Sequence, residues 1–411
     1  MPFQMHMTRP GRYGFDAARL ARIDAFLKER YLDSGKLPHA QLLLARDGEI
    51  AHFSHQGAAR EAGAPVDEGT LFRIASMTKP ITSLAFMMLV EEARVALDTP
   101  VHHVLPEFKG LGVYAGGGGG VPFLTRATTE PMRMVDLLRH TSGLTYSFQN
   151  RTNVDAAYRE SKMENWHGNL TLDEFVAALG RLPLEFSPGA EWNYSVSTDV
   201  LGAVVERVSG MQLDRFFVER IFGPLGMNDT FFAVPAEKID RLADCWALDE
   251  KTGKRMLYDR GDASAWSRFP RLVSGGGGLV STALDYHRFC TMCLNGGVLD
   301  GVRLVSPKTI ALMTTNHLPG SSDLATMSRS LFSEATNAGT GFGLGFAVTT
   351  DVARTLVPGS VGEYYWGGMF STAFFVDPVE RIHMVFMTQF TPSMRYPIRR
   401  ELKTLIYSAL T

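Results

Sequence analysis

Ser76 and Lys79, three positions apart, have the types and spacing of a nucleophile and its activating group. They stand in the segment FRIASMTKPITSLAFMMLVEE, which otherwise has the pattern of an apolar helix. Residues three apart on a helix share a face, so the hydroxyl and the ammonium group are expected side by side. Lys79 would then stabilise a deprotonated hydroxyl as a cation or, if desolvated and neutral, take up its proton.

The position of Pro80 indicates where this helix begins. Proline is tolerated in the first turn of a helix, so a helix from about Ser76 to Val95 is expected. The positive end of the helix dipole would favour an oxyanion at Ser76. The motif alone is weak, because a chain of 411 residues contains roughly one Ser-x-x-Lys by chance. A helix-capping Ser76 with a surface Lys79 is the structural alternative.

Two further segments supply groups that a nucleophilic site needs. FSPGAEWNYSVSTDVLGAVVERVSG places Tyr194 just before an amphipathic helix, where its phenol can project into a cleft. GEYYWGGMFSTAFFVD places Trp366, Gly367 and Gly368 at the start of a strand. The two glycines there let the backbone approach a ligand and leave N–H groups unobstructed.

Together these segments predict an acyl-transfer site. Ser76 is the expected nucleophile, and Lys79 and Tyr194 form its basic pair. The backbone N–H groups of Ser76 and Met369 would bind the oxyanion, where losing one such donor costs about 3 kcal/mol of transition-state stabilisation. The structural alternative for Tyr194 is an aromatic residue at the edge of the core, with its hydroxyl group hydrogen-bonded.

The elements that must position these residues come from both ends of the chain. Residues 15–35 predict a helix, and a hairpin with a tight turn at Asp47-Gly48 follows. The C-terminal end adds two strands and a final helix, which suggests one sheet assembled from both termini. We therefore predict an α/β (α+β) fold with an antiparallel sheet flanked by helices.

The middle of the chain predicts short helices separated by glycine and proline, an all-helical insertion between the two halves of the sheet. The expected sheet domain is 1–95 with 270–411, and the mainly helical domain is 96–269, with the site between them. The segment YAGGGGGVP reads as a flexible surface loop; it lacks the pattern of a phosphate-binding loop.

Composition excludes several function classes. The net charge is −2 with no basic run, so no nucleic-acid partner is expected. The sequence contains no run of eighteen apolar residues, so no membrane span is predicted. The start of the chain does not resemble a secretory signal, so we expect a cytoplasmic protein. Of the three cysteines, Cys290 and Cys293 form C-x-x-C in a helical pattern, and we interpret them as buried core residues. Neither a metal nor another cofactor is predicted.

At this point the sequence resembles the serine β-lactamase and penicillin-recognising family, most closely class C β-lactamases and family VIII carboxylesterases. The resemblance covers most of the chain from Phe15 onward. It rests on several motifs in the expected order: SMTK, DLLRHTSGL, FSPGAEWNYSV, PLGMNDT, GGGGLVSTALDYHRF and WGG. It implies a β-lactamase/transpeptidase-like fold and a covalent acyl-enzyme on Ser76. Tyr194 would be the general base aided by Lys79, and the coupled pair leaves open which of the two takes the proton.

The sequence departs from class C β-lactamases at two motifs. Their Tyr-x-Asn is Tyr194-Ser195-Val196 here, and their Lys-Thr-Gly is Trp366-Gly367-Gly368. The missing lysine removes a cation that would hold the lactam carboxylate, so a neutral ester is the expected substrate.

Tyr364, Tyr365 and Trp366 are expected to offer an apolar aromatic wall to that substrate instead. Phe148 is a further candidate for the acyl pocket by the family layout. Core packing explains it equally well.

The predicted activity is the hydrolysis of short-chain acyl esters, a small-molecule substrate. The alternatives are acyl transfer to an alcohol at the same site, β-lactamase or DD-peptidase activity, and a non-catalytic binding protein. A lipase-type triad is not supported, because Gly-x-Ser-x-Gly is absent from the sequence. His140 is expected to orient a loop rather than to react.

Overall fold

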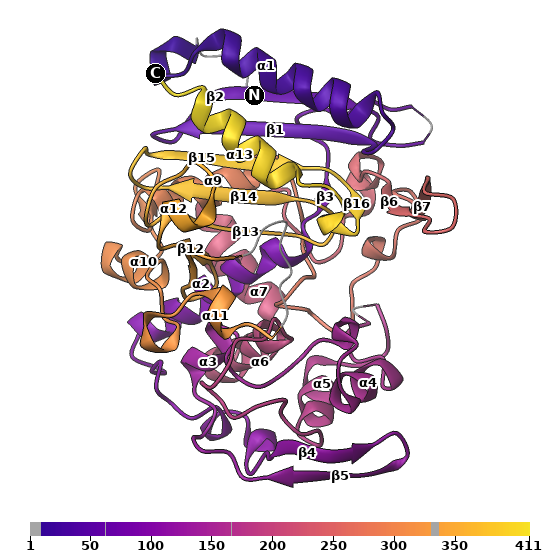
Figure 1. Cartoon of the computed structure of the whole chain (residues 1–411), viewed down its shortest axis with the longest axis vertical. Helices are drawn as coiled ribbons and strands as arrows, with labels where there is room; N and C mark the ends of the chain where they lie inside the picture. Colours follow the sequence, from indigo (N-terminus) through magenta and orange to yellow (C-terminus); the bar gives the residue numbers. More distant parts are fainter. Residues whose placement is uncertain (1–9, 62, 166, 330–336) are drawn as a thin grey trace.

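A large antiparallel sheet forms the upper part of the molecule (Figure 1). The computed structural model describes residues 10–61, 63–165, 167–329 and 337–411, so the predicted absence of a secretory signal falls largely on residues that lie outside the description. Over the described residues the sheet contains seven strands in the order β11-β12-β13-β14-β15-β1-β2. In this order the strands are Thr340–Phe342, Ala347–Thr349, Tyr364–Gly367, Ala373–Asp377, Ile382–Met387, His39–Arg46 and Glu49–Gly57.

The two ends of the chain meet inside this sheet, as the sequence predicts. Strand β1 pairs with β15 in antiparallel register, with Leu43 opposite Val385. The hairpin β1–β2 turns at Asp47 and Gly48, which have φ of 54° and 85°, the left-handed pair that a two-residue turn requires. The N-terminal and C-terminal strands are therefore direct neighbours in the sheet, next to its β2 edge.

Helices cover both faces because the strand side chains alternate between two apolar clusters. Helices α1 (Ala17–Leu27) and α13 (Ile398–Ser408) pack on the face that carries Leu42, Leu44 and Phe386. Helices α2 (Thr78–Glu91) and α9 (Ala283–Leu294) pack on the opposite face, against Leu43 and Val385. The three layers are visible in Figure 1, with α1 and α13 in front of the sheet and α9 behind it.

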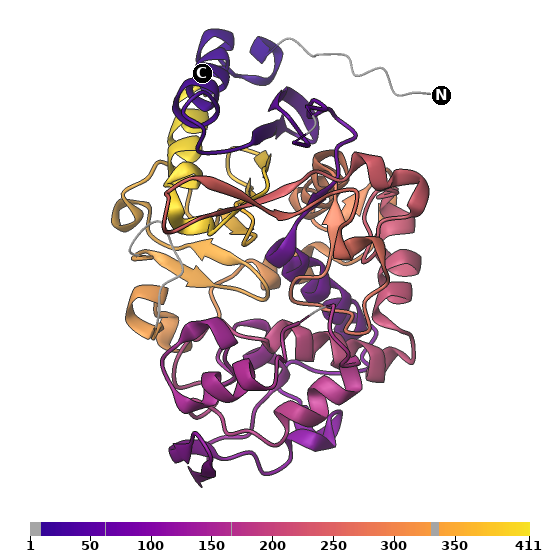
Figure 2. The same ribbon diagram turned by 90° about the vertical axis from the view of Figure 1, so that its right-hand side faces the viewer.

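The helical part lies beneath the sheet, as the purple and magenta ribbons in Figure 2 show. Its longest helix, α6, packs on α2 and so connects the two parts. The described helices of this part are α3 (Met134–Leu138), α4 (Asn153–Glu160), α5 (Leu172–Leu179), α6 (Ser197–Ser209), α7 (Leu213–Phe217) and α8 (Gly223–Leu225). Three short helices follow α9 on the sheet side: α10 (Pro307–Met313), α11 (Leu324–Met327) and α12 (Val352–Thr355).

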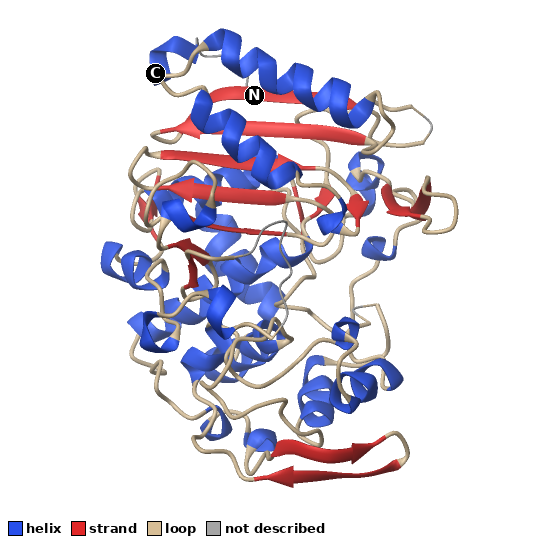
Figure 3. Cartoon of the chain, in the orientation of Figure 1, coloured by secondary structure: helices blue, strands red, loops and turns tan. Residues whose placement is uncertain are grey.

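The insertion is not all helical, which corrects the sequence prediction. The glycine-rich segment expected as a loop is part of a hairpin, β4 (Val113–Gly118) with β5 (Val121–Arg126), at the lower end of the molecule (Figure 3). The hairpin forms because successive glycines at 117–120 adopt positive φ and turn the chain back.

A second group of strands crosses the predicted boundary at residue 269. Strands β6 (Cys245–Leu248) and β7 (Arg255–Asp259) pair, and β6 also pairs with β16 (Phe390–Thr391) near the C-terminus. Residues 245–259 therefore associate with the sheet side. The predicted domain limits otherwise stay a prediction.

Candidate active site

Ser76 lies at the entrance of α2, in a short 3₁₀ turn over Ala75–Met77 that leads directly into the helix. The preceding residue, Ala75, has φ of 44°, a left-handed conformation that costs energy for any residue except glycine. Such strain is typical of functional sites, where the surrounding structure imposes it. The predicted start of the helix is confirmed, whereas α2 ends at Glu91 rather than Val95 because Ala93 turns left-handed.

Lys79 is buried, with 1% of its surface exposed, and its ammonium group contacts three oxygen atoms. Its Nζ lies 3.2 Å from Ser76 Oγ, 3.0 Å from the Tyr146 hydroxyl and 2.6 Å from the carbonyl oxygen of Gly276. An ammonium has three N–H donors, so these three acceptors match its full capacity. The surface alternative for Lys79 is wrong, because Tyr146 and Gly276 pack against its side chain and bury it.

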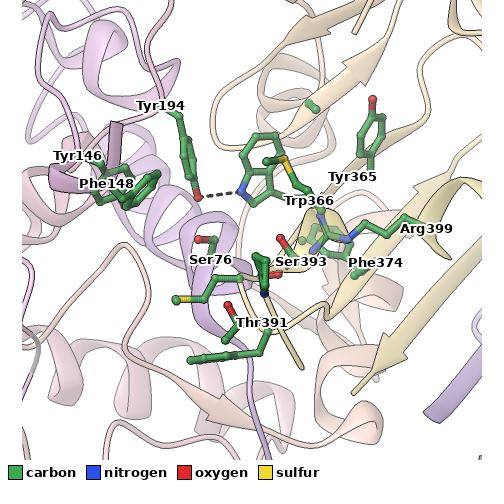
Figure 4. A pocket seen from close by; sticks show the side chains of 18 of the residues that line it. Ser76, Tyr146, Phe148, Tyr194, Tyr365, Trp366, Phe374, Thr391, Ser393 and Arg399 are labelled. Atoms are coloured by element: carbon green, nitrogen blue, oxygen red, sulfur yellow. Dashed lines mark hydrogen bonds between the residues drawn. The ribbon is translucent and has the colours of Figure 1, made fainter. Parts of the chain in front are cut away.

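Tyr194 faces the same lysine from the segment that precedes α6. The Lys79 Nζ lies 4.7 Å from the centroid of the Tyr194 ring. The indole N–H of Trp366 donates a hydrogen bond of 3.3 Å to the Tyr194 hydroxyl. Figure 4 shows the Tyr194 hydroxyl and the Trp366 indole directed towards each other above Ser76. The structure thus brings together the nucleophile and the basic pair that the sequence predicts.

Both glycines of the WGG motif are required by close packing, Gly367 against Arg399 and Gly368 against the turn that carries Ser76. A Cβ atom on Gly368 would clash with the carbonyl oxygen of Ile74, two residues before the nucleophile. This contact brings the end of β13 next to the 3₁₀ turn, and both Met369 and Ser76 line the same cavity. The arrangement supports the predicted oxyanion donors, the N–H groups of Ser76 and Met369. It stays a prediction until an oxyanion analogue is bound.

Tyr146 is a site residue that the sequence analysis missed. Its hydroxyl accepts from Lys79, and burial together with the nearby Asp199 charge raises the pKa of Tyr146 well above its ordinary value. The phenol is therefore a neutral partner of the ammonium group. Its sequence position, two residues before Phe148, carries no spacing that distinguishes it from a core aromatic residue. Phe148 stacks on Tyr146 with ring centroids 4.8 Å apart, lines the cavity and is 48% exposed.

Glu164 holds the loop that carries Tyr146. Its carboxylate accepts 2.7 Å from the backbone N–H of Ser147 and 2.6 Å from the Ser147 hydroxyl. Burial raises the pKa of Glu164 to about 7, against the opposing effect of these hydrogen bonds. No feature of the sequence distinguishes this glutamate, because it lies in an irregular segment that only the fold brings to the site.

Tyr365 does not form the aromatic wall that the sequence analysis proposed. Successive strand residues point to opposite faces, so Tyr365 lies on the α13 face when Trp366 points to the site. The Tyr365 hydroxyl is 3.2 Å from the Thr340 hydroxyl, and Lys403 lies over its ring. Figure 4 shows it set apart from Ser76 although the same large cavity extends to it. Trp366 alone supplies the wall from this strand.

His140 and the cysteines are buried, as predicted for the cysteines, and the loop-orienting role of His140 stays a prediction. His140 is buried beside Tyr194, with ring centroids 5.0 Å apart. Burial and the Lys79 charge lower the pKa of His140 well below its ordinary value, which keeps the imidazole neutral. Cys290 and Cys293 are buried on α9 as free thiols, and burial raises the pKa of both. Among the described residues no cluster of histidine, cysteine or carboxylate side chains could hold a metal ion.

The site opens into a cavity of about 1000 Å³. This is at the upper end of volumes typical of small-molecule pockets. Its mouth carries partly exposed apolar side chains: Phe148, Tyr258, Met369 and Met394. The cavity therefore accommodates an acyl group together with a bulky second group.

In the described part of the chain no helix has the length and hydropathy needed to traverse a lipid bilayer.

Comparison with known proteins places this geometry in a family. A family model described as Beta-lactamase matches residues 23–407. The chain belongs to the beta-lactamase family. Protein Rv1367c of Mycobacterium tuberculosis is 36% identical over 81% of each chain. Esterase EstB of Burkholderia gladioli is 32% identical and covers 97% of this chain and 98% of its own.

The solved structures agree with this assignment. EstCE1, described as a hydrolase with promiscuous acyltransferase activity, superposes with a TM-score of 0.77 at 26% identity, covering 95% of this chain and 99% of its own. The family and the fold that the sequence motifs predict are thereby confirmed. Within the family the chain is a serine hydrolase.

Proposed function

We propose that this protein is a serine carboxylesterase that hydrolyses short-chain acyl esters through an acyl-enzyme on Ser76. The observation that carries the proposal is the position of Lys79, whose Nζ contacts Ser76 Oγ at 3.2 Å beneath the Tyr194 ring. In this arrangement the Ser76 proton passes to the Lys79–Tyr194 pair as Oγ attacks the ester carbonyl. The same pair returns a proton to the leaving alcohol, and a water molecule then releases the acid.

The preference for an ester over a β-lactam rests on Trp366. Class C β-lactamases have a lysine at the motif where this chain has Trp366, and here the indole N–H is already engaged with the Tyr194 hydroxyl. The position therefore offers an apolar surface rather than a cation for a lactam carboxylate. The similarity to Esterase EstB over nearly the whole of both chains supports the same assignment.

A spectrophotometric comparison of p-nitrophenyl butyrate with nitrocefin tests the substrate class. We expect the ester to be turned over with the higher kcat/KM. Faster nitrocefin hydrolysis would instead identify a β-lactamase. Ser76→Ala should lower the esterase kcat/KM by about 10⁴-fold or more, because the nucleophile acts as a unit with its base. Ser393→Ala, which alters another hydroxyl lining the cavity, is the matched control and should retain most of the activity.

Acyl transfer to an alcohol is the second candidate, favoured by the cavity of about 1000 Å³ and its apolar mouth. A bound alcohol in this space would compete with water for the acyl-enzyme. The printed description of EstCE1 includes acyltransferase activity, which supports this candidate. Product analysis with vinyl butyrate and excess benzyl alcohol separates the two: a hydrolase yields butyric acid, and a transferase yields benzyl butyrate.

The remaining parts of the proposal concern partners and location. The expected partner is a small-molecule ester, without nucleic acid or a membrane. Cytoplasmic location is part of the proposal, and fractionation of the native host's cells tests it.

A further inference from the structure

Asp199 is a buried carboxylate that the mechanism above does not use. It lies in the first turn of α6 with 3% of its surface exposed, five residues after Tyr194. Its Oδ1 accepts 2.5 Å from the Ser274 hydroxyl and 3.0 Å from the backbone N–H of Gly276. A carboxylate so deeply buried is costly unless a positive charge and hydrogen bonds compensate it.

The compensating charge is Lys79. Burial raises the pKa of the Asp199 carboxyl, and the Lys79 charge opposes that rise together with the two hydrogen bonds. The positive end of the α6 dipole acts in the same direction. The Lys79 charge, the two hydrogen bonds and the helix dipole all favour the ionised carboxylate.

The two charged groups are also joined through one residue. The N–H of Gly276 donates to Asp199, and the carbonyl oxygen of the same residue accepts from Lys79 at 2.6 Å. A Cβ atom on Gly276 would clash with the Asp199 carboxylate, so glycine is required for this close approach. Asp199 therefore fixes both the position of the Lys79 acceptor and the electrostatic potential around Lys79.

We infer that Asp199 is the counter-ion of Lys79 and sets the pH range in which the Lys79–Tyr194 pair can transfer a proton. The inference rests on the proposed acyl-transfer function. Because Asp199 touches neither the substrate nor Ser76, it is a positioning residue. It also explains why Lys79 contacts hydroxyl and carbonyl oxygens only: its counter-charge lies behind Gly276, and the face towards Ser76 stays open for proton transfer.

The other ionisable groups around this pair are accounted for. Burial and the Lys79 charge keep His140 neutral, and the pKa of Tyr146 is raised well above its ordinary value by burial. Glu164 contributes a further negative charge, and its effect reaches both Tyr146 and Asp199. Asp199 differs from these groups because it accepts a hydrogen bond from Gly276, the residue whose carbonyl oxygen contacts Lys79.

Asp199→Asn tests the inference, because the amide oxygen can still accept both hydrogen bonds while the charge is removed. The pair titrates as a unit, so both limbs of the kcat/KM pH profile should move to lower pH by about one to three units. A purely structural role would lower the whole profile without moving it, and that result would overturn the inference. The matched control is Asp136→Asn, which removes another buried carboxylate, paired with Arg139, and should leave the limbs in place.

A second measurement on the wild-type protein needs no substrate. The ¹⁵N resonance of Lys79 Nζ, in protein labelled selectively on lysine and assigned by its loss in Lys79→Arg, reports the charge of the side chain. We expect an ammonium signal at pH 7. A neutral amine would show that Asp199 has no cation to balance. Because this readout is independent of turnover, it separates failure of the inference from failure of the proposed esterase activity.

Discussion

A lysine, a carboxylate and a tyrosine come together in two regions of the molecule, with opposite results. In the active site, Lys79 bonds to a serine hydroxyl, a phenol and a carbonyl oxygen, and its carboxylate Asp199 lies behind Gly276. Where α13 packs on the sheet, Lys403 of this helix forms a direct ion pair of 2.6 Å with Glu363. The lysine that exchanges protons is separated from its carboxylate by the backbone of Gly276. The lysine that only stabilises the fold contacts its carboxylate directly.

The phenols of the two clusters differ in the same way. Tyr146 accepts from Lys79. The Tyr407 hydroxyl lies 2.6 Å from Glu363 and 2.5 Å from Asp377, both fully buried. One phenol has a single hydrogen to donate, so it can donate to only one of these carboxyl groups at a time. Burial raises the pKa of Glu363, and the Lys403 charge opposes that rise.

Replacing the two lysines should separate catalysis from stability. Lys79→Met is expected to lower kcat/KM by about 10³-fold or more, because the proton-transferring pair loses a member. Lys403→Met is expected to leave kcat/KM within about threefold and to lower the free energy of unfolding by about 3 kcal/mol, because Glu363 remains buried and unpaired. Steady-state kinetics and urea unfolding measure both effects. The comparison fails if Lys403→Met inactivates a protein whose stability is unchanged.

The two phenols provide the next test. Tyr146→Phe removes one acceptor of the Lys79 ammonium and should lower kcat/KM by roughly 10- to 100-fold with a small change in stability. Tyr407→Phe should do the reverse and cost about 1–3 kcal/mol of folding free energy. Kinetics and thermal unfolding of the pair are sufficient. Equal losses of activity in both variants would contradict the assignment of Tyr146 to the site.

Glu164 predicts a pH dependence of stability with a definite sign. Its folded pKa of about 7 lies above its ordinary value, so the folded state binds the proton more tightly. The contribution of Glu164 to the free energy of unfolding should therefore fall by up to roughly 3 kcal/mol as the pH rises from about 4.5 to 7. Glu164→Gln keeps an acceptor for the Ser147 N–H and should flatten this part of the curve. Urea unfolding between these pH values measures it; identical curves for both proteins would exclude the effect.

The smallest effect is expected at Tyr365, which lies on the opposite face of the sheet from Ser76. Tyr365→Phe should change kcat/KM by less than about twofold, because it removes only the contact with Thr340. Trp366→Phe is the informative neighbour, since it removes the donor to the Tyr194 hydroxyl and should reduce kcat/KM by roughly tenfold. A larger loss for Tyr365→Phe would restore it to the substrate-binding wall.

The sequence predicts the parts of the site that depend on local spacing. The i, i+3 relation and Pro80 place Ser76 and Lys79 correctly, and the position of Tyr194 before a helix is also correct. Gly276 acts through its backbone carbonyl, which has no signature in side-chain type. Tyr146 and Asp199 become site residues only when α6 and the loop before α4 pack against α2.

The fold shows the same division. The strand patterns at both ends of the chain predict the sheet and the helices that cover it, because the strand side chains contribute to an apolar cluster on each face. The hairpin at residues 113–126 escapes prediction, since its glycines carry no side chain to show alternation and β5 is largely exposed. The error at Tyr365 arose from treating three consecutive aromatic residues as one surface, although strand geometry divides them between two faces.

The adjacency of β1 and β15 determines when this enzyme becomes competent during its synthesis. The strand that brings Met369 to the nucleophile, and Arg399, which donates to the carbonyl oxygen of Gly368, emerge from the ribosome long after Ser76 and Lys79. Pairings between residues so distant along a chain form slowly. A nascent polypeptide that already displays Ser76 and Lys79 therefore lacks the predicted Met369 donor until β13 and α13 have joined the sheet.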